Sequence, residues 1–249
     1  MIVGAQFYTL RESCKDLEGF ATTLARVADI GYTTVQISGV CEYEPQWLAE
    51  QLKKNGLKCV LTHKSLDRMK EDASSLCKEH DVFDCKYIGL GSYKFEQGIS
   101  AEVEDFKKIA TPIAEEFLKN GKYFMYHNHA KEFKKNNNVT LLEEMSLAMP
   151  AELMGFTLDT YWVQVAGGDS AQWLRKLKNR VPCIHLKDCG YKQIMLPVGE
   201  GNINFDAVFA AAEEAGTEYM LVEQDNCNEE DPFDCMKRSY NNLKAFGFR

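Results

Sequence analysis

The sequence lacks long hydrophobic runs and any excess of positive charge. At no point do 18 apolar residues follow one another, the shortest run that would predict a membrane-spanning helix. Its 37 Asp and Glu residues outnumber its 29 Lys and Arg residues, which gives a formal net charge of −8. Proteins that bind nucleic acids usually carry a basic stripe that releases counterions from the phosphates. We therefore expect neither a membrane nor DNA or RNA as a partner.

Close cysteine pairs and a secretion signal are also missing. The nine cysteines include no C-x-x-C pair, and the chain begins Met1-Ile2-Val3 with neither a basic segment nor a long apolar run. An odd, scattered set of cysteines without such a signal indicates reduced thiols that behave as small hydrophobic side chains. The sequence predicts a cytoplasmic protein.

A dinucleotide-binding motif is absent as well. The glycine-rich pieces Gly89-x-Gly91, Gly167-Gly168 and Gly199-x-Gly201 do not form a G-x-G-x-x-G after the first predicted strand. A dinucleotide cofactor is therefore not expected. A phosphate group on the substrate stays open, because Gly199-x-Gly201 with Lys187 and Lys192 upstream could contact one.

What the sequence does contain is one strand-helix pattern repeated eight times. Short β-branched or aromatic runs alternate with longer segments of helical period, which predicts parallel strands joined by crossover helices. Strands are predicted near residues 2–7, 33–38, 58–63, 86–90, 122–127, 154–159, 182–187 and 219–223, and helices near 16–29, 45–55, 66–80, 101–120, 140–148, 170–179, 206–215 and 233–246. No linker-like stretch divides the series, and 249 residues suit eight such units. We predict an α/β protein in which residues 1–249 form a single (β/α)8 TIM barrel.

Polar side chains gather where these predicted strands end. Functional residues of such a barrel lie on the loops after the strand C-termini. The side chains in such positions are His63, His127, His129, Asp159, His185, Lys187 and Glu223. His80 instead closes a predicted helix, where the helix dipole favours it, and is predicted to lie at the surface.

Four acidic or imidazole groups recur at the spacing of one strand-helix unit. Glu132, Asp159, His185 and Glu223 are separated by 27, 26 and 38 residues. A buried carboxylate without a partner is costly, and a bound metal ion removes that cost. This mixture of ligands suits one divalent ion such as Mn²⁺, Mg²⁺, Co²⁺ or Zn²⁺, and is unlike a cysteine-rich structural zinc site.

Three of these residues also have a purely structural interpretation. Asp159 would cap a helix that starts at Thr160, and His185 would be a hydrogen-bonded core histidine. Glu132 would be a solvated loop charge, since Lys131 precedes it directly. These alternatives stay open in the sequence alone.

Together the motifs resemble the xylose-isomerase-like barrel superfamily, in particular the sugar phosphate isomerase/epimerase family with its relatives of inosose dehydratase and ketose 3-epimerases. The matching segments span nearly the whole chain: residues 6–11 (QFYTLR), 126–133 (YHNHAKEF), 159–163 (DTYWV), 167–169 (GGD), 185–188 (HLKD), 198–201 (VGEG) and 222–225 (VEQD). The resemblance implies one divalent metal held by acidic groups from strands five, six and eight and a histidine from strand seven. Carried over to this chain, the ligands are Glu132, Asp159, His185 and Glu223. His127 is the alternative to Glu132, because it aligns with a strand-ending glutamate of the family.

The resemblance also implies a small sugar or polyol as substrate. Glu132 and Glu223 would act as acid and base in an isomerase or epimerase that forms an enediolate from a ketose. The groups that would bind the substrate are His63, His127, His129, Trp162 and Lys187. For Trp162, ordinary packing at the barrel rim is the alternative. A homo-oligomer is compatible with the family.

Other functions share this barrel. A dehydratase or lyase acting on a keto-inositol or keto-glycoside would begin with the same deprotonation, so it is the main alternative. A DNA-repair enzyme like endonuclease IV fits less well, because five histidines and a charge of −8 suit neither a trinuclear zinc cluster nor a DNA-binding face. A non-catalytic sugar-binding protein would show no response to a divalent metal.

Overall fold

The computed structural model describes residues 1–248 and contains a closed barrel of eight strands. Around the barrel the strand order is β1-β12-β9-β8-β5-β4-β3-β2, and every neighbouring pair is parallel. The barrel strands are β1 (Ile2–Gln6), β2 (Thr34–Ile37), β3 (Lys58–His63), β4 (Tyr87–Leu90), β5 (Tyr123–His127), β8 (Met154–Asp159), β9 (Cys183–Leu186) and β12 (Tyr219–Val222). The predicted TIM barrel is therefore confirmed.

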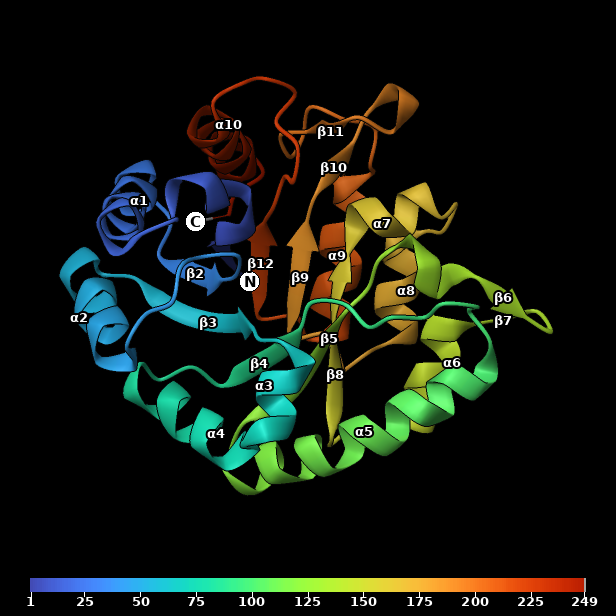
Figure 1. Cartoon of the computed structure of the whole chain (residues 1–249). Coiled ribbons are helices and arrows are strands. Elements are labelled where there is room, and N and C mark those ends of the chain that lie inside the picture. Colours follow the sequence, from blue (N-terminus) through green and yellow to red (C-terminus); the bar gives the residue numbers. More distant parts are fainter. Residues whose placement is uncertain (249) are drawn as a thin grey trace.

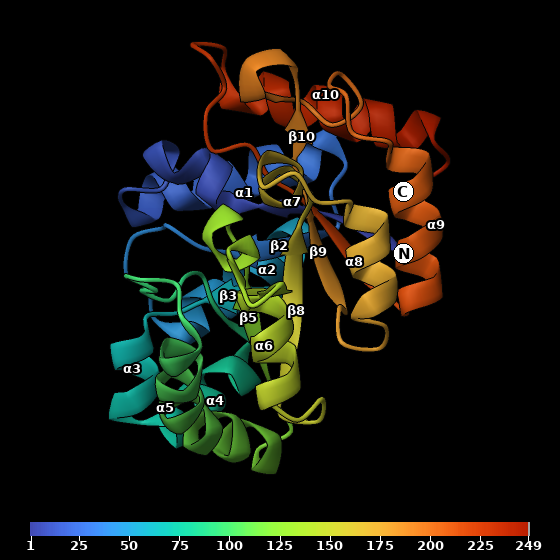
Figure 2. The same cartoon turned by 90° about the vertical axis from the view of Figure 1, so that its right-hand side faces the viewer.

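Helices surround this barrel (Figures 1 and 2). They are α1 (Leu17–Ile30), α2 (Pro45–Asn55), α3 (Leu66–Glu71), α4 (Ala73–Val82), α5 (Ser100–Lys119), α6 (Leu141–Ala148), α7 (Thr160–Val165), α8 (Ser170–Lys176), α9 (Phe205–Ala215) and α10 (Pro232–Ala245). Three 3-10 helices, η1 (Phe7–Ser13), η2 (Ala130–Phe133) and η3 (Tyr191–Gln193), and two small hairpins, β6 (Lys135–Asn136) with β7 (Val139–Thr140) and β10 (Asp188–Cys189) with β11 (Met195–Leu196), lie in the loops. Within residues 1–248, none of the helices combines the length and the apolar character needed to cross a membrane.

The helices differ from the predicted ones at two places. The single helix predicted at 66–80 is divided into α3 and α4 at Asp72, whose carboxylate accepts a hydrogen bond from the Ser75 backbone N–H and so starts a new helix. The short helix α7 directly after β8 lies outside the eight predicted helices, but its start at Thr160 matches the structural alternative given for Asp159. It begins where the Asp159 carboxylate accepts a hydrogen bond from the Trp162 backbone N–H.

Alternation along the strands decides which side chains reach the barrel mouth. Outward residues such as Phe124 and Phe156 pack in the large apolar cluster that includes the helices, whereas Met125, Cys183 and Leu221 belong to a small separate cluster contributed by the strands alone. Successive side chains of a strand point to opposite faces, so the residue two positions after each of these inward side chains also points inward. At the strand ends these residues are polar. They are His127 after Met125, His185 after Cys183 and Glu223 after Leu221.

The surface position predicted for His80 is wrong. The side chain is fully buried on α4, with Nδ1 2.7 Å from the carbonyl oxygen of Leu76 and Nε2 2.7 Å from Thr62 Oγ1 on β3. The Leu76 carbonyl can only accept, so Nδ1 carries the proton and Nε2 accepts from the Thr62 hydroxyl. Burial lowers the pKa of His80 to about 3. The histidine therefore joins a helix to the barrel in its neutral form.

Candidate metal centre and substrate cavity

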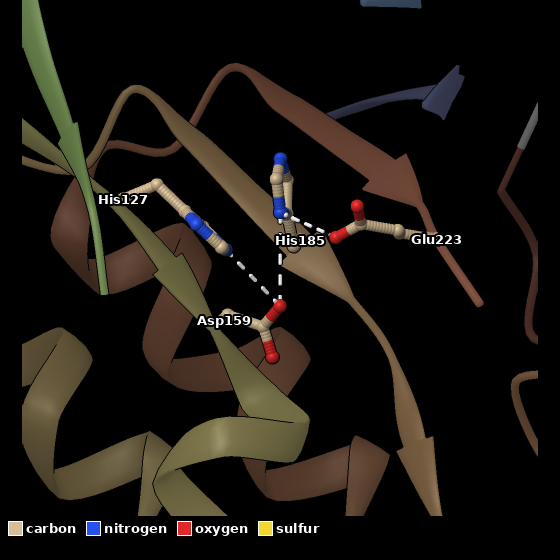
Figure 3. Close-up of side chains that lie close together, drawn as sticks. All are labelled: His127, Asp159, His185 and Glu223. Atoms are coloured by element: carbon tan, nitrogen blue, oxygen red, sulfur yellow. Dashed lines mark hydrogen bonds and ion pairs between the residues drawn. The ribbon is translucent and has the colours of Figure 1, made fainter. Parts of the chain in front are cut away.

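Four potential ligands meet at the carboxyl ends of β5, β8, β9 and β12. One ligand atom each from His127, Asp159, His185 and Glu223 lies within 4.8 Å of the other three, and all four residues are buried. Figure 3 shows the four side chains converging from separate strands. Parallel pairing brings the strand ends together, since Asp159 lies opposite His185 in the β8–β9 register. The barrel thus gathers residues that are up to 96 positions apart in the sequence.

Both imidazoles direct a free nitrogen into this cluster. His127 Nδ1 lies 2.9 Å from the carbonyl oxygen of Gly91, and His185 Nε2 lies 2.7 Å from Gln36 Oε1. Each of these oxygens accepts a hydrogen bond from the ring N–H, so His127 Nε2 and His185 Nδ1 are the nitrogens that can offer a lone pair to a metal. Such second partners are the usual way in which metal-binding histidines are held in one tautomer and orientation.

The contacts inside the cluster suit a metal ion better than a hydrogen-bond network. His185 Nδ1 lies 2.8 Å from Glu223 Oε2, yet neither atom has a partner with hydrogen-bond geometry. The Asp159 Oδ2 atom is 3.2 Å from His127 Nε2 and 3.7 Å from His185 Nδ1. Buried polar atoms without partners are costly and rare. Donors that point at one common centre would instead be satisfied together by a cation, so the residues fit a divalent metal.

Lys187 and three carboxylates set the charge of the centre. The Lys187 ammonium lies 3.1 Å from Asp159 Oδ2, 3.0 Å from Glu223 Oε2 and 3.0 Å from Asp225 Oδ2. Burial would lower the pKa of Lys187, but these carboxylates outweigh it and raise the pKa above its ordinary value. Burial would likewise raise the pKa of Asp159 and Glu223, but Lys187 holds both well below the usual range. Burial would lower the pKa of His185, but Glu223 and Asp159 outweigh it and raise the pKa to about 9. Without a metal the His185 imidazolium and the Lys187 ammonium therefore offset the carboxylates, and a bound divalent cation would take the place of the His185 proton.

A cavity of about 550 Å³ opens onto Lys187, Glu223 and Asp225. Of the side chains predicted to bind a substrate, His63, His127, His129 and Lys187 line it, together with the predicted base Glu223. Burial, with a smaller contribution from His127, lowers the pKa of His129 to about 3, and its buried Nδ1 has no hydrogen-bond partner within residues 1–248. The cavity wall therefore contains a neutral imidazole.

Trp162 is not among the residues that line the cavity but contacts two that are. Its ring centroid is 5.3 Å from that of His129, and the Lys187 ammonium is 5.7 Å from the Trp162 ring centroid. The indole supports two of the residues that line the cavity.

Glu132 is buried outside the four-residue cluster. Its Oε1 accepts a hydrogen bond of 2.6 Å from the Tyr126 hydroxyl, and its Oε2 accepts one of 2.9 Å from the His129 backbone N–H. The side chain is fully buried, and burial raises its pKa above the ordinary value despite these bonds. Because η2 folds the chain back, Glu132 holds the loop that carries His129. His127 occupies the position nearest the other three potential ligands.

Comparison with known proteins identifies the family. A model described as xylose isomerase-like TIM barrel matches residues 24–238. The chain belongs to this family. No curated protein sequence matches it.

Solved structures with the same fold have low sequence identity. A sugar phosphate isomerase/epimerase from Parabacteroides distasonis ATCC 8503 has a TM-score of 0.85 and 21% identity, and the match covers 98% of this chain and 93% of that chain. An L-ribulose 3-epimerase has a TM-score of 0.79 and 14% identity over 98% and 94% of the two chains. The IOLI protein with a binding zinc atom has a TM-score of 0.77 and 14% identity over 98% and 97%. These likenesses concern the fold.

In this xylose isomerase-like barrel, the backbone N–H groups of the glycine-rich loop around Gly199 and Gly201 bind a carboxylate of the chain itself. The Asp188 carboxylate accepts backbone hydrogen bonds from Gly199 (2.9 Å), Gly201 (2.8 Å), Cys189 (2.8 Å) and Ile203 (3.3 Å). The two glycine amides considered for a substrate phosphate are therefore already used. Asp188 therefore holds the loop between β9 and α9 in place.

Three polar residues of the site were not predicted. Gln36 orients His185, Asn128 Oδ1 accepts a 3.0 Å hydrogen bond from the Asp159 backbone N–H, and Asp225 pairs with Lys187. Gln36 is fully buried on β2, and a glutamine between Val35 and Ile37 in a predicted strand was the available signal. Asp225 stands two residues after Glu223, on the same face of an extended chain.

Proposed function

We propose that this protein is a divalent-metal-dependent isomerase or epimerase of a small ketose or related polyol. The observation that carries the proposal is the convergence of four buried donor atoms, from the ends of four different barrel strands, within 4.8 Å of one another, two of which belong to residues that line a cavity, His127 and Glu223. Active sites of TIM-barrel enzymes lie at this face of the barrel. The epimerases among the structural neighbours support the choice of reaction class.

His127, Asp159, His185 and Glu223 are the proposed ligands of one Mn²⁺, Mg²⁺, Co²⁺ or Zn²⁺ ion. His127, the alternative ligand, takes the place that the family resemblance gives to Glu132, because the Glu132 carboxylate is engaged by Tyr126 and His129. When bound, such an ion polarises a substrate carbonyl and stabilises negative charge on its oxygen. Two imidazoles and two carboxylates are a donor set that all four metals accept in proteins.

Glu223 is the proposed base. It lies at the cavity, its pKa is held low, and it is therefore ionised and able to take a proton from the carbon next to a carbonyl. The Lys187 ammonium, 3.0 Å from the same carboxylate, would stabilise the enediolate that forms.

His129 and His63 are proposed to bind substrate hydroxyl groups. Both line the cavity and burial keeps the pKa of both imidazoles below the ordinary value, so each offers one donor and one acceptor. His63 has space for its ring because its neighbour on β4 is Gly89, where a Cβ atom would lie 2.8 Å from the His63 Cδ2 atom. Glu132 is proposed to act indirectly, by positioning His129.

The test uses metal-loaded protein and a panel of ketoses, keto-inositols and keto-glycosides in deuterated water. We expect deuterium to enter one sugar at the carbon next to its carbonyl, in a product of the same composition. Glu223→Gln should abolish incorporation, whereas Glu213→Gln on the exposed face of α9 should leave it unchanged. Release of water or an aglycone would support the dehydratase or lyase instead. A metal-loaded protein that exchanges no proton with any of these compounds would contradict both.

A further inference from the structure

A second cavity adjoins the substrate cavity. It measures about 470 Å³, and its walls include Leu17, Val40, Cys41, Glu42, Tyr43 and Glu44 from the α1 start and the loop between β2 and α2. Ser38, His63 and Lys64 line both cavities. Each volume falls within the range of about 300–1,000 Å³ that is usual for a complete small-molecule site. The cleft thus continues from the metal centre past His63.

The boundary between the two cavities is built from residues held in place. His63 Nδ1 lies 3.4 Å from Ser38 Oγ, and the His63 ring packs 5.5 Å from the His127 ring and 5.8 Å from the His185 ring, measured between centroids. Gly91 gives the imidazole room, since a Cβ there would lie 3.0 Å from His63 Nδ1. A ligand that reaches from the metal ligands into the second cavity would therefore pass along a fixed edge of His63.

The lining of the second cavity favours a neutral, hydroxylated group. Glu42 and Glu44 are exposed there and can accept hydrogen bonds from hydroxyl groups, whereas they would repel a phosphate or carboxylate. The cation in the lining, Lys64, already donates a 3.2 Å hydrogen bond to the Tyr43 hydroxyl. Leu17 and Val40 add apolar surface for the C–H face of a ring. This mixture of carboxylates and apolar patches is the chemistry that recognises a sugar ring.

We propose that the substrate is a ketose that carries a second sugar ring, with the ketose at the metal centre and the second ring in the cavity of Val40 and Glu42. This inference rests on the proposed function, because that function places a ketose at the metal centre. A monosaccharide alone would leave the second cavity unused.

The test is calorimetric titration of the metal-loaded protein with D-fructose and with three glucosylfructoses that differ in linkage: turanose, leucrose and isomaltulose. We expect at least one disaccharide to bind about tenfold or more tightly than fructose. Val40→Trp, which fills the second cavity, should bring that affinity back to the fructose value and leave fructose binding unchanged. Leu147→Trp is the matched control, because Leu147 is 78% exposed on α6 and lines neither cavity.

Glu42→Gln gives a second, milder variant in case the tryptophan disturbs folding. It should reduce the advantage of the disaccharide and leave fructose binding unchanged. Three disaccharides that bind no more tightly than fructose would overturn the inference, as would an advantage that survives Val40→Trp. Deuterium incorporation into the same sugars reports separately on the proposed function. If the native protein exchanges the fructose proton but binds no disaccharide more tightly than fructose, the second-ring site alone is refuted, and absence of exchange with any sugar refutes the enzyme.

Discussion

At the residue scale, the choice between His127 and Glu132 decides the character of the metal centre. His127 donates to the Gly91 carbonyl and directs its other nitrogen at Asp159, whereas Glu132 receives hydrogen bonds from Tyr126 and His129. With His127 the centre has two neutral and two anionic donors. With Glu132 it would have one neutral and three anionic donors, and a larger negative charge.

Substitutions separate these alternatives. His127→Ala should lower the affinity for Mn²⁺ or Zn²⁺ by about 100-fold, because a direct ligand is lost. Glu132→Gln should change the affinity far less but lower the free energy of unfolding by about 1–3 kcal/mol, since its amide group cannot accept both buried hydrogen bonds. Titration calorimetry and urea unfolding provide the two numbers. The reverse order of metal affinities would make Glu132 the ligand.

Lys187 offsets the buried carboxylates of the site when no divalent ion is present. Its side chain is 1% exposed, and its ammonium pairs with three carboxylates. Lys187→Met should therefore lower the free energy of unfolding in metal-chelating buffer by about 3 kcal/mol or more, the usual cost of removing one partner of a buried ion pair. Saturating Mn²⁺ should recover much of that loss. Lys54→Met on the exposed face of α2 is the control, and equal stability of the two variants in chelating buffer would refute this role.

At the scale of elements, α4 is joined to β3 by a histidine that must stay neutral. The pKa of His80 is about 3 in the folded protein and near its ordinary value of 6.5 in the unfolded chain. The unfolded chain therefore takes up a proton on His80 at a higher pH than the folded protein does. The stabilisation of the folded protein by neutral His80 is complete above pH 6.5 and is lost as the pH falls towards 3.

Unfolding at two pH values checks this linkage. Between pH 7.5 and 5.5 the free energy of unfolding should fall by about 1.4 kcal/mol more in the native protein than in His80→Gln. The glutamine cannot titrate, and it can still accept from Thr62. Identical pH slopes of the two proteins would show that the histidine contributes nothing to acid sensitivity.

The loop between β9 and α9 is organised by a single carboxylate. Asp188 accepts hydrogen bonds from four backbone N–H groups, including those of Gly199 and Gly201. Asp188→Ala should cost about 2 kcal/mol or more of unfolding free energy, because buried donors lose their acceptor. Asp206→Ala, at an exposed position of α9, is the control. Faster amide hydrogen exchange confined to residues 195–204 would locate the effect, and unchanged exchange there would contradict it.

The strand ends of the site could be predicted from the sequence because alternation and spacing are local properties. Asp159, His185 and Glu223 each end an apolar run, and parallel strands carry their ends to one face. The fourth donor could not be chosen in this way. Residues 126–132 contain two candidate donors, and the choice depends on how η2 turns Glu132 back onto Tyr126 and His129. Gln36 and Asp225 were missed because their roles depend on partners 149 and 38 positions away.

At the scale of the whole molecule, closure of the barrel brings the proposed metal ligands together. These ligands lie at the ends of β5, β8, β9 and β12, which are consecutive around the barrel although the ligands span residues 127–223. No single segment holds two of the four proposed ligands, so the site can form only when the strands are paired. Divalent metal that binds the folded protein alone will stabilise the fold, by about 2.7 kcal/mol at a concentration 100 times its Kd.

X-ray absorption spectroscopy of the zinc-loaded protein tests the proposed metal centre most directly. We expect one zinc ion per chain with two imidazole nitrogens at about 2.0–2.1 Å and carboxylate oxygens completing the coordination. His127→Ala should reduce the imidazole count to one. A spectrum of the native protein with a single imidazole would contradict the assignment of His127, and a protein that retains no zinc would contradict the metal centre itself.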